Sequence, residues 1–318
     1  MVEISGFAEE PFDNVKEVFR DNFDKRNEVG GSFCVYYNNK KVVEIWGGYK
    51  DQNKREKWNE TTLTPVFSTS KAVSAACLAL LHSRGYFEYD DKVCSYWPEF
   101  SQNGKGNITI QQLLQHRAGL SAIDKKLTPE IINNHKKLDK ILAKQSPHWK
   151  PGTQQGYHVW TIGWYMSALL SRIDPDGRRI SQFIKEEFNQ KTAGEFYIGI
   201  DNDFNMGRLA TLIPFSKLKG FLSMPFKFVK EFFKPWSVTF KSMLNPFFAS
   251  DHSNFKHSFA DNKQAFGGFG AGGSFVIIDP KHNITIAYTM NKMSPKIMNG
   301  EREVALRDSV YKSIKNVN

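Results

Sequence analysis

The stretch FSTSKAVSAACLALL, residues 67–81, places a serine three positions before a lysine, at the start of a run of small apolar residues. Positions i and i+3 of a helix lie on one face, so Ser68 and Lys71 are expected to be neighbours. A desolvated lysine has a lowered pKa and, as a neutral amine, can take a proton from a hydroxyl group. The spacing therefore fits an activated serine nucleophile. A structural alternative stays open, in which Ser68 caps the helix and Lys71 points to water.

The S-x-x-K spacing alone has little specificity. It occurs four times in this chain, starting at Ser68, Ser216, Ser253 and Ser309.

The other groups that this chemistry requires must therefore come from other segments. Acyl transfer at a serine needs a second acid/base for the leaving group and N–H donors that meet the oxyanion. Tyr157 follows a Pro-Gly turn and precedes an expected helix, a position from which its phenol can face a pocket. GGFGAGGSFVIID (267–279) is a glycine cluster that runs into a strand, and glycine lets backbone N–H groups approach a ligand closely.

Several ordered segments carry a family resemblance over about residues 10–312. They are FSTSK (67–71), LLQHRAGL (113–120), PGTQQGYHVWTIGW (151–164), FGAGGSFVIIDP (269–280) and AYTMNKM (287–293). Together they resemble the serine β-lactamase and penicillin-binding-protein superfamily. More narrowly, they resemble class C β-lactamases, family VIII carboxylesterases and eukaryotic β-lactamase-domain proteins. The resemblance implies an α+β fold with an antiparallel sheet, flanking terminal helices and an inserted, mostly helical subdomain.

The resemblance also implies roles for individual residues. Ser68 would be the nucleophile, Lys71 would lower the pKa of the serine and relay its proton, and Tyr157 would be the general base and acid. The backbone N–H groups of Ser68 and Ala271 would form the oxyanion hole. Substrate-pocket positions would be His158, Gly268, Phe269 and Gly270, with the bulky Phe269 at the pocket edge favouring an apolar acyl group.

Two motifs depart from the family pattern. Val159 stands where β-lactamases usually have Asn, two residues after the tyrosine. Gly268, Phe269 and Gly270 stand where the family has Lys or His, a small residue and Gly. The missing cationic or imidazole group helps to hold the substrate carboxylate in penicillin-type chemistry, so β-lactam hydrolysis is not expected. Hydrolysis of esters or amides without that carboxylate remains compatible with the retained Ser68, Lys71 and Tyr157.

Two histidines lie close to these motifs. His116, in the HRAGL turn, is predicted to be structural and to bond backbone rather than to act in catalysis. For His158, orientation of Tyr157, a place in the pocket wall and packing at the helix start all stay open.

The elements that must position these residues can be read from periodicity. Residues 11–26 have helical spacing, 31–49 and 273–290 are expected to be β-hairpins, and 300–315 is expected to be a helix. They predict one antiparallel sheet with the terminal helices on one face. Stretches 68–84, 107–120, 158–172 and 178–188 are expected to be helical. We therefore expect a single domain, 1–318, with a sheet subdomain (1–66 and 265–318) and a helical subdomain (67–264).

One segment is unusual in composition. Residues 215–248 contain nine Phe, six Lys and one acidic residue, Glu231. Such a segment can fill a core with Phe, cover a pocket as a lid or substrate wall, or lie on a membrane surface. The first interpretation is favoured, a lid or substrate wall comes second and membrane-surface contact third. Self-association of the protein also stays open.

Charge and composition argue against several other classes of binding site. The net charge is +10, but no zinc-finger spacing or RNP motif is present, so nucleic-acid binding is not expected. The glycine pattern G-x-G-x-x-G at 268–273 precedes a strand rather than a helix, which argues against a dinucleotide site. No metal site or cofactor is expected. The acidic N-terminus without an apolar core and three sparse cysteines predict a cytoplasmic protein, or a mitochondrial one if an upstream extension is missing.

Two functions from different classes remain. The first is a serine hydrolase that acts through an acyl-enzyme on a small-molecule ester, amide or peptide, most similar to a carboxylesterase. The second is a catalytically inactive member of the fold that works by binding or self-assembly, an alternative that the missing Lys or His supports.

Overall fold

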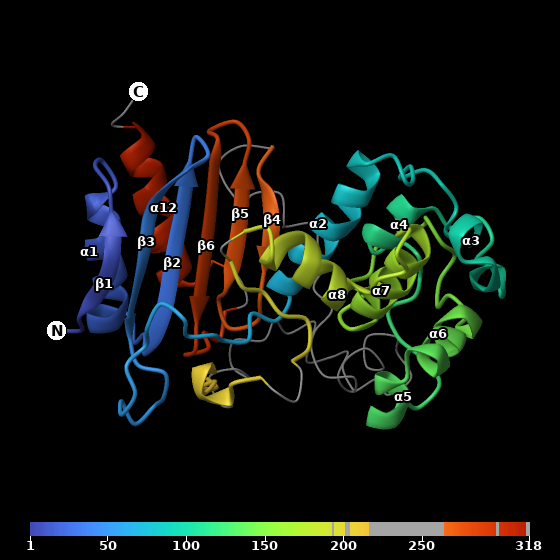
Figure 1. Cartoon of the computed structure of the whole chain (residues 1–318), viewed down its shortest axis with the longest axis horizontal. Helices are drawn as coiled ribbons and strands as arrows, with labels where there is room; N and C mark the ends of the chain where they lie inside the picture. The colour runs from blue at the N-terminus through green and yellow to red at the C-terminus, as the bar shows by residue number, and fades with distance from the viewer. Residues whose placement is uncertain (193, 201–203, 216–263, 297–298, 316–318) are drawn as a thin grey trace. The chain divides into compact units, whose positions relative to one another are not determined.

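The computed structural model describes residues 1–192, 194–200, 204–215, 264–296 and 299–315 (Figure 1). The described residues fall into two compact units. The first comprises Met1–Ala72 and the described parts of Asp201–Met224 and Asn254–Asn318, and the second comprises the described part of Val73–Ile200. Apart from Phe215, the segment 215–248 lies outside the described residues, and so do the predictions made for it. No helix in the described ranges has both the length and the apolar character that a membrane span needs.

The first unit is built on a six-stranded antiparallel sheet with strand order β1-β3-β2-β6-β5-β4. Its strands are β1 (Ile4–Ala8), β2 (Gly30–Tyr37), β3 (Lys40–Gly48), β4 (Phe266–Phe269), β5 (Phe275–Asp279) and β6 (Ile284–Met290). The two ends of the chain meet at the centre of the sheet, where Phe33 of β2 is opposite Tyr288 of β6. This confirms the predicted antiparallel sheet made from both ends of the sequence.

Two terminal helices, α1 (Asp13–Lys25) and α12 (Glu301–Lys315), pack against each other and against this sheet (Figure 1). Their apolar side chains share one buried core with alternate residues of the strands. Members of this core are Val15, Phe19, Phe33, Val35, Ile45, Ile286, Tyr288, Leu306, Val310 and Ile314. The helical periodicity of α1 and the two-residue alternation of the strands both point into this core, as the sequence predicted.

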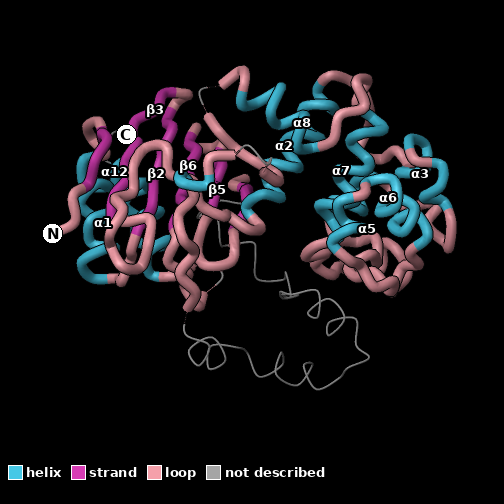
Figure 2. Tube along the Cα trace, turned by 60° about the horizontal axis from the view of Figure 1, so that its bottom comes forward, coloured by secondary structure: helices cyan, strands magenta, loops and turns pink. Residues whose placement is uncertain are grey.

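The second unit is helical, apart from its connecting segments (Figure 2). Its elements are α3 (Val93–Tyr96), η1 (Pro98–Ser101), α4 (Ile110–Leu114), α5 (Pro129–Asn133), α6 (His135–Lys144), α7 (Thr161–Ile173), α8 (Ile180–Ile184) and η2 (Lys185–Asn189). α2 (Thr69–Ser83) begins in the first unit and contributes its later turns, with Leu78, to the core of the second. α7 is central in that core, with Tyr165 and Leu169 fully buried.

Two strands were not anticipated, and one begins later than expected. β1 (ISGFA) and β4 (FGGF) contain glycines, which weaken the local strand signal. β5 begins at Phe275 because residues 270–273 form a turn in which the Gly273 N–H donates to the Gly270 carbonyl, at 3.1 Å. The glycine cluster therefore closes a hairpin between β4 and β5.

Replacing Phe33 by alanine should destabilise the first unit by about 3–5 kcal/mol, because this side chain is 1% exposed at the centre of the sheet. The measurement is urea unfolding followed by circular dichroism and tryptophan fluorescence. Tyr36→Ala is the control on the same strand, since that side chain is 41% exposed. Equal losses for the two variants would contradict the assigned core.

Candidate active site

The Ser68 hydroxyl and the Lys71 ammonium group are in contact. Lys71 Nζ lies 3.1 Å from Ser68 Oγ, as the i, i+3 spacing predicts. Burial lowers the pKa of Lys71 from 10.5 to about 8, because the charged form loses hydration. A neutral amine is therefore available near neutral pH at hydrogen-bonding distance from a hydroxyl group.

The backbone that presents Ser68 has an uncommon conformation. Phe67, immediately before the serine, has a φ of 48°, in the left-handed region that bulky side chains rarely adopt. α2 then begins at Thr69, and the N–H of Lys71 donates to the Ser68 carbonyl at 3.0 Å. Ser68 thus stands at a sharp turn into a helix, where a strained residue needs the surrounding structure to hold it.

Ser274, the residue before β5, supplies that support. Its hydroxyl donates to the Val66 carbonyl at 2.9 Å, and the Thr69 hydroxyl lies 3.1 Å from Ser274 Oγ and 3.2 Å from the Ser274 carbonyl. Val66 and Thr69 bracket Ser68 in the sequence. These hydrogen bonds, which we call the Ser274 clamp, therefore fix the serine turn to the glycine turn of the β4–β5 hairpin.

Gly270 of this hairpin leaves no room for a side chain, and Gly268 leaves little. A Cβ on Gly270 would lie 2.1 Å from the Val66 carbonyl oxygen and 2.2 Å from Ser274 Oγ. A Cβ on Gly268 would lie 3.1 Å from the Cβ of Ala72. Close backbone approach, rather than loop flexibility, is thus the physical reason for glycine here.

Two backbone N–H groups of this region remain available as donors. Among the described residues, neither the Ser68 N–H nor the Ala271 N–H has a hydrogen-bond acceptor. The Gly270 N–H, in contrast, donates to the Ser274 carbonyl at 2.7 Å. Ser68 and Ala271 are the pair that the family resemblance predicts for the oxyanion hole.

The two phenylalanines of β4 point in opposite directions. Phe269 is opposite Phe275, is 9% exposed and packs in the core of the sheet, so the aromatic side chain expected at the pocket edge is not there. Phe266 shares a face of the strand with Gly268 and Gly270, the face that meets the start of α2, and is 53% exposed. Phe266 was not among the residues predicted from the sequence, although strand alternation from Gly268 would have indicated it.

Tyr157 belongs to the second unit, where His116 holds both of its neighbours. The His116 carbonyl accepts from the Gly156 N–H at 3.0 Å, and His116 Nδ1 accepts from the His158 N–H at 3.0 Å. The rings of His116 and Tyr157 pack edge to face, with centroids 4.8 Å apart. This agrees with the structural role predicted for His116, and it gives the tyrosine loop a defined backbone.

His158 is fully buried, and both of its ring nitrogens contact backbone. Its Nε2 accepts from the Leu120 N–H at 3.0 Å, so Nδ1 carries the proton and donates to the Gly156 carbonyl at 2.5 Å. Burial lowers its pKa to about 4, which agrees with a neutral ring. Of the three roles that the sequence left open for His158, this geometry favours the one in which His158 orients the loop that carries Tyr157. Val159, beside it, is also buried.

Cys34 and Cys77 do not compete as nucleophiles. Burial raises the pKa of Cys34 to about 11 and that of Cys77 to about 12, so both thiols stay protonated at neutral pH. The described ranges also contain no cluster of three His, Cys, Asp or Glu side chains able to hold a metal ion.

Comparison with known proteins identifies the class. A family model described as Beta-lactamase matches residues 15–203, more than half of the chain. The chain therefore belongs to the Beta-lactamase family, and the predicted resemblance is confirmed.

One curated relative is named as both an esterase and a β-lactamase. Esterase/beta-lactamase LipL of Mycobacterium tuberculosis is 31% identical over 184 residues, which are 58% of this chain and 42% of that protein. This chain thus matches about two fifths of the length of that curated relative.

Two solved structures cover nearly the whole chain. A family VIII carboxylesterase matches with a TM-score of 0.82, and a penicillin-binding protein homologue from Caulobacter crescentus with a TM-score of 0.80. Each is 26% identical and covers 98% of this chain and 100% of its own. The β-lactamase/transpeptidase-like fold, with an antiparallel sheet and helices, is therefore confirmed.

The lowered pKa of Lys71 predicts a pH-dependent effect on stability. Between about pH 8 and pH 10.5 the unfolded chain holds one proton more at this residue than the native protein, so native stability rises with pH in that window. Lys71→Met removes this dependence. We expect the variant to be more stable than the wild type near neutral pH, and the difference to shrink above about pH 8.

The measurement is urea unfolding of both proteins between about pH 7 and about pH 10. Lys281→Met, in the exposed β5–β6 turn, is the matched control. A difference between Lys71→Met and the wild type that stays constant with pH would show that Lys71 does not titrate as described.

Proposed function

We propose that this protein is a serine hydrolase that cleaves a carboxylic ester or amide through an acyl-enzyme. The observation that carries the proposal is the 3.1 Å contact between Ser68 Oγ and a lysine whose pKa is lowered to about 8. A serine is a weak nucleophile until a neighbouring base takes its proton, and the neutral Lys71 amine is such a base. The esterase among the relatives and the carboxylesterase among the structures support the same reaction class.

The proposed reaction has two halves. Ser68 Oγ attacks the substrate carbonyl carbon while its proton passes to Lys71 Nζ. Tyr157 donates its phenol proton to the leaving alcohol or amine as the bond to the acyl carbon breaks, and it recovers a proton from Lys71. Water then attacks the acyl-enzyme and gives a proton to Tyr157 while Tyr157 passes its own phenol proton to the neutral Lys71 amine. Lys71 returns that proton to Ser68 Oγ as the bond to the acyl carbon breaks, which releases the carboxylic acid and the free serine.

Charge on the carbonyl oxygen is stabilised in this proposal by the N–H groups of Ser68 and Ala271. Their lack of an acceptor among the described residues supports this role, because such donors need no rearrangement before they meet an oxyanion. The Ser274 clamp holds the two turns together, which is the preorganisation that such a site requires.

The preferred substrate is an ester with an apolar acyl group and without a recognition carboxylate. Gly268 provides no cation to hold the carboxylate of a penicillin, so we do not expect efficient β-lactam hydrolysis. Phe266, exposed beside Gly268 on the same face of β4, is the side chain proposed to contact the acyl group.

Labelling with a fluorophosphonate probe tests the proposal directly. The wild type is expected to label at Ser68, and Ser68→Ala is expected to abolish labelling. Lys71→Met and Tyr157→Phe are each expected to slow ester hydrolysis by about 10²–10⁴-fold, the usual contribution of a positioned acid or base.

Ser70→Ala is the matched control, because Ser70 lies in the same turn of α2 but lacks the spacing to Lys71. It is expected to label at nearly the wild-type rate. Absence of labelling in a folded wild-type protein would contradict the proposal and favour the alternative, a member of the fold that acts by binding or self-assembly.

A second prediction concerns acyl preference. Phe266→Ala is expected to reduce kcat/KM for a hexanoate ester about tenfold more than for an acetate ester, since only the longer chain reaches the ring. Phe7→Ala, a half-exposed phenylalanine on the opposite edge strand β1, is the control. An equal effect of Phe266→Ala on the two esters would assign this side chain a structural role.

A further inference from the structure

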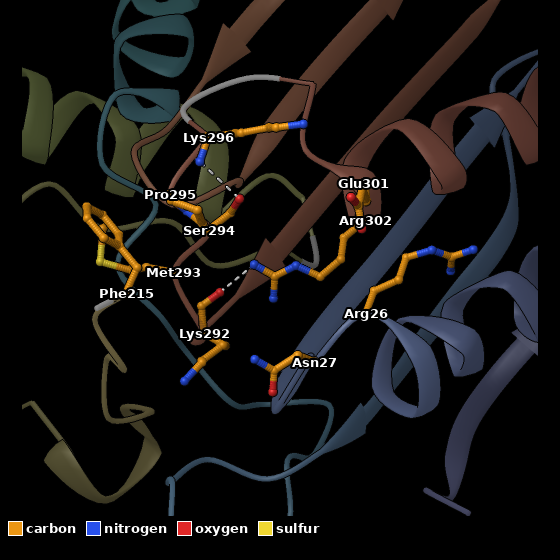
Figure 3. Close-up of a pocket in the computed structure, with 10 residues that line it drawn as sticks. All are labelled: Arg26, Asn27, Phe215, Lys292, Met293, Ser294, Pro295, Lys296, Glu301 and Arg302. Atoms are coloured by element: carbon orange, nitrogen blue, oxygen red, sulfur yellow. Dashed lines mark hydrogen bonds between the residues drawn. The ribbon is translucent and has the colours of Figure 1, made fainter. Parts of the chain in front are cut away.

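The first unit contains a cavity of about 470 Å³ that the proposed reaction does not use (Figure 3). Its volume is within the range of small-molecule sites. The lining comes from the end of α1, the start of α12, Phe215 and the segment 292–296 that follows β6. None of the residues assigned to catalysis lines it.

The cavity is rich in positive charge. Arg26, Lys292, Lys296 and Arg302 line it, and Glu301 is the only carboxylate in the lining. Arg302 already forms an ion pair with the buried Glu28, whose Oε2 lies 2.7 Å from Arg302 Nη1. Glu303, whose pKa burial raises to about 7, also interacts electrostatically with Arg302 and Lys296. The lining itself still carries more positive than negative groups. Within the described part of the chain, neither Lys292 nor Lys296 forms an ion pair.

Arg302 is held rigidly at this site. It is 6% exposed, and its Nη2 donates to the Lys292 carbonyl at 2.7 Å, which ties α12 to the segment 292–296. Figure 3 shows its guanidinium group among the labelled residues, directed at the main chain of Lys292. A cation that is buried and fixed in this way loses little side-chain entropy when an anion binds beside it.

Two further features define the ligand. Glu301 and Arg302 are the first residues of α12, a helix of 15 residues, so the cavity lies at the positive end of the helix dipole, where the Gly300 N–H already donates to Glu303 Oε2. Met293, Pro295 and Phe215 give the same cavity an apolar side. A suitable ligand therefore has an anionic head and an apolar substituent.

We propose that this cavity binds a phosphate monoester with an apolar substituent, at a site separate from Ser68. A phosphate monoester carries nearly two negative charges at neutral pH, which complement the excess positive charge of the lining. The segment 292–296 is also bonded to the glycine turn, because the Ser294 N–H donates to the Gly272 carbonyl at 2.8 Å. A ligand bound to this segment is therefore connected, through this hydrogen bond, to the turn that carries Ala271.

The test is calorimetric titration of Ser68→Ala protein with hexyl phosphate at low ionic strength. The Ser68→Ala background prevents turnover, so the result does not depend on whether the protein is a hydrolase. Hexyl phosphate is expected to bind, and Lys292→Gln/Lys296→Gln in the same background is expected to bind about tenfold more weakly. Both lysines are at least partly exposed, so the double variant should fold, which circular dichroism checks.

Lys281→Gln/Lys312→Gln removes the same charge from two exposed positions of the same unit and is expected to leave the affinity unchanged. Hexanol tests the need for the anionic head, and inorganic phosphate, expected to bind more weakly than hexyl phosphate, tests the apolar side. Equal affinity of the two double variants, binding of hexanol as tight as that of hexyl phosphate, or equal binding of inorganic phosphate would overturn the proposal.

Discussion

The hydrogen bonds of Ser274 are the constraint on which the candidate site depends. This one serine, directly before β5, forms hydrogen bonds with Val66, two residues before Ser68, and with Thr69, the residue directly after it. The bonded groups are buried or partly buried, so loss of a partner would leave polar atoms without water or protein to satisfy them. This clamp keeps Phe67 in its left-handed conformation and brings the glycine turn against the start of α2. The glycines follow from the clamp, since any side chain at Gly270 would occupy the space that the hydrogen bonds need.

Lys71 and Phe67 both cost stability at the same place. A lysine whose burial lowers its pKa to about 8 is less stable in its charged form than an exposed lysine, and a bulky residue at positive φ is strained. Both features serve to present a hydroxyl group next to an amine, with Lys71 Nζ 3.1 Å from Ser68 Oγ. Catalytic sites typically lower the stability of the fold in this way. The large apolar core shared by the sheet, α1 and α12 offsets the loss.

The glycine turn has a second set of neighbours on the side of α12. Glu303 packs so closely on Gly273 that a Cβ there would lie 2.3 Å from its Oε1, and burial raises the pKa of Glu303 to about 7. Ser294 bonds the same turn through Gly272. The turn that carries Ala271 is therefore held from the serine side by the clamp and from the other side by α12 and the segment 292–296. A cavity rich in positive charge beside this second support links an anionic ligand, where one binds, to the geometry of the proposed oxyanion hole.

The family, the strongly periodic elements and the contact between Ser68 and Lys71 could all be predicted from the amino-acid sequence. These features are local, because a helix brings positions i and i+3 together wherever it forms. Three other features depend on tertiary contacts. They are the directions of the Phe266 and Phe269 side chains, the hydrogen bonds of Ser274, and the hydrogen bonds from His116 to both neighbours of Tyr157. Val66 and Ser274 are 208 positions apart, and no local pattern specifies which hydroxyl will meet which carbonyl across such a distance. The sequence also did not predict which face of β4 each side chain lies on. Two of its four residues are glycines, and a shift of one residue in a strand exchanges its faces.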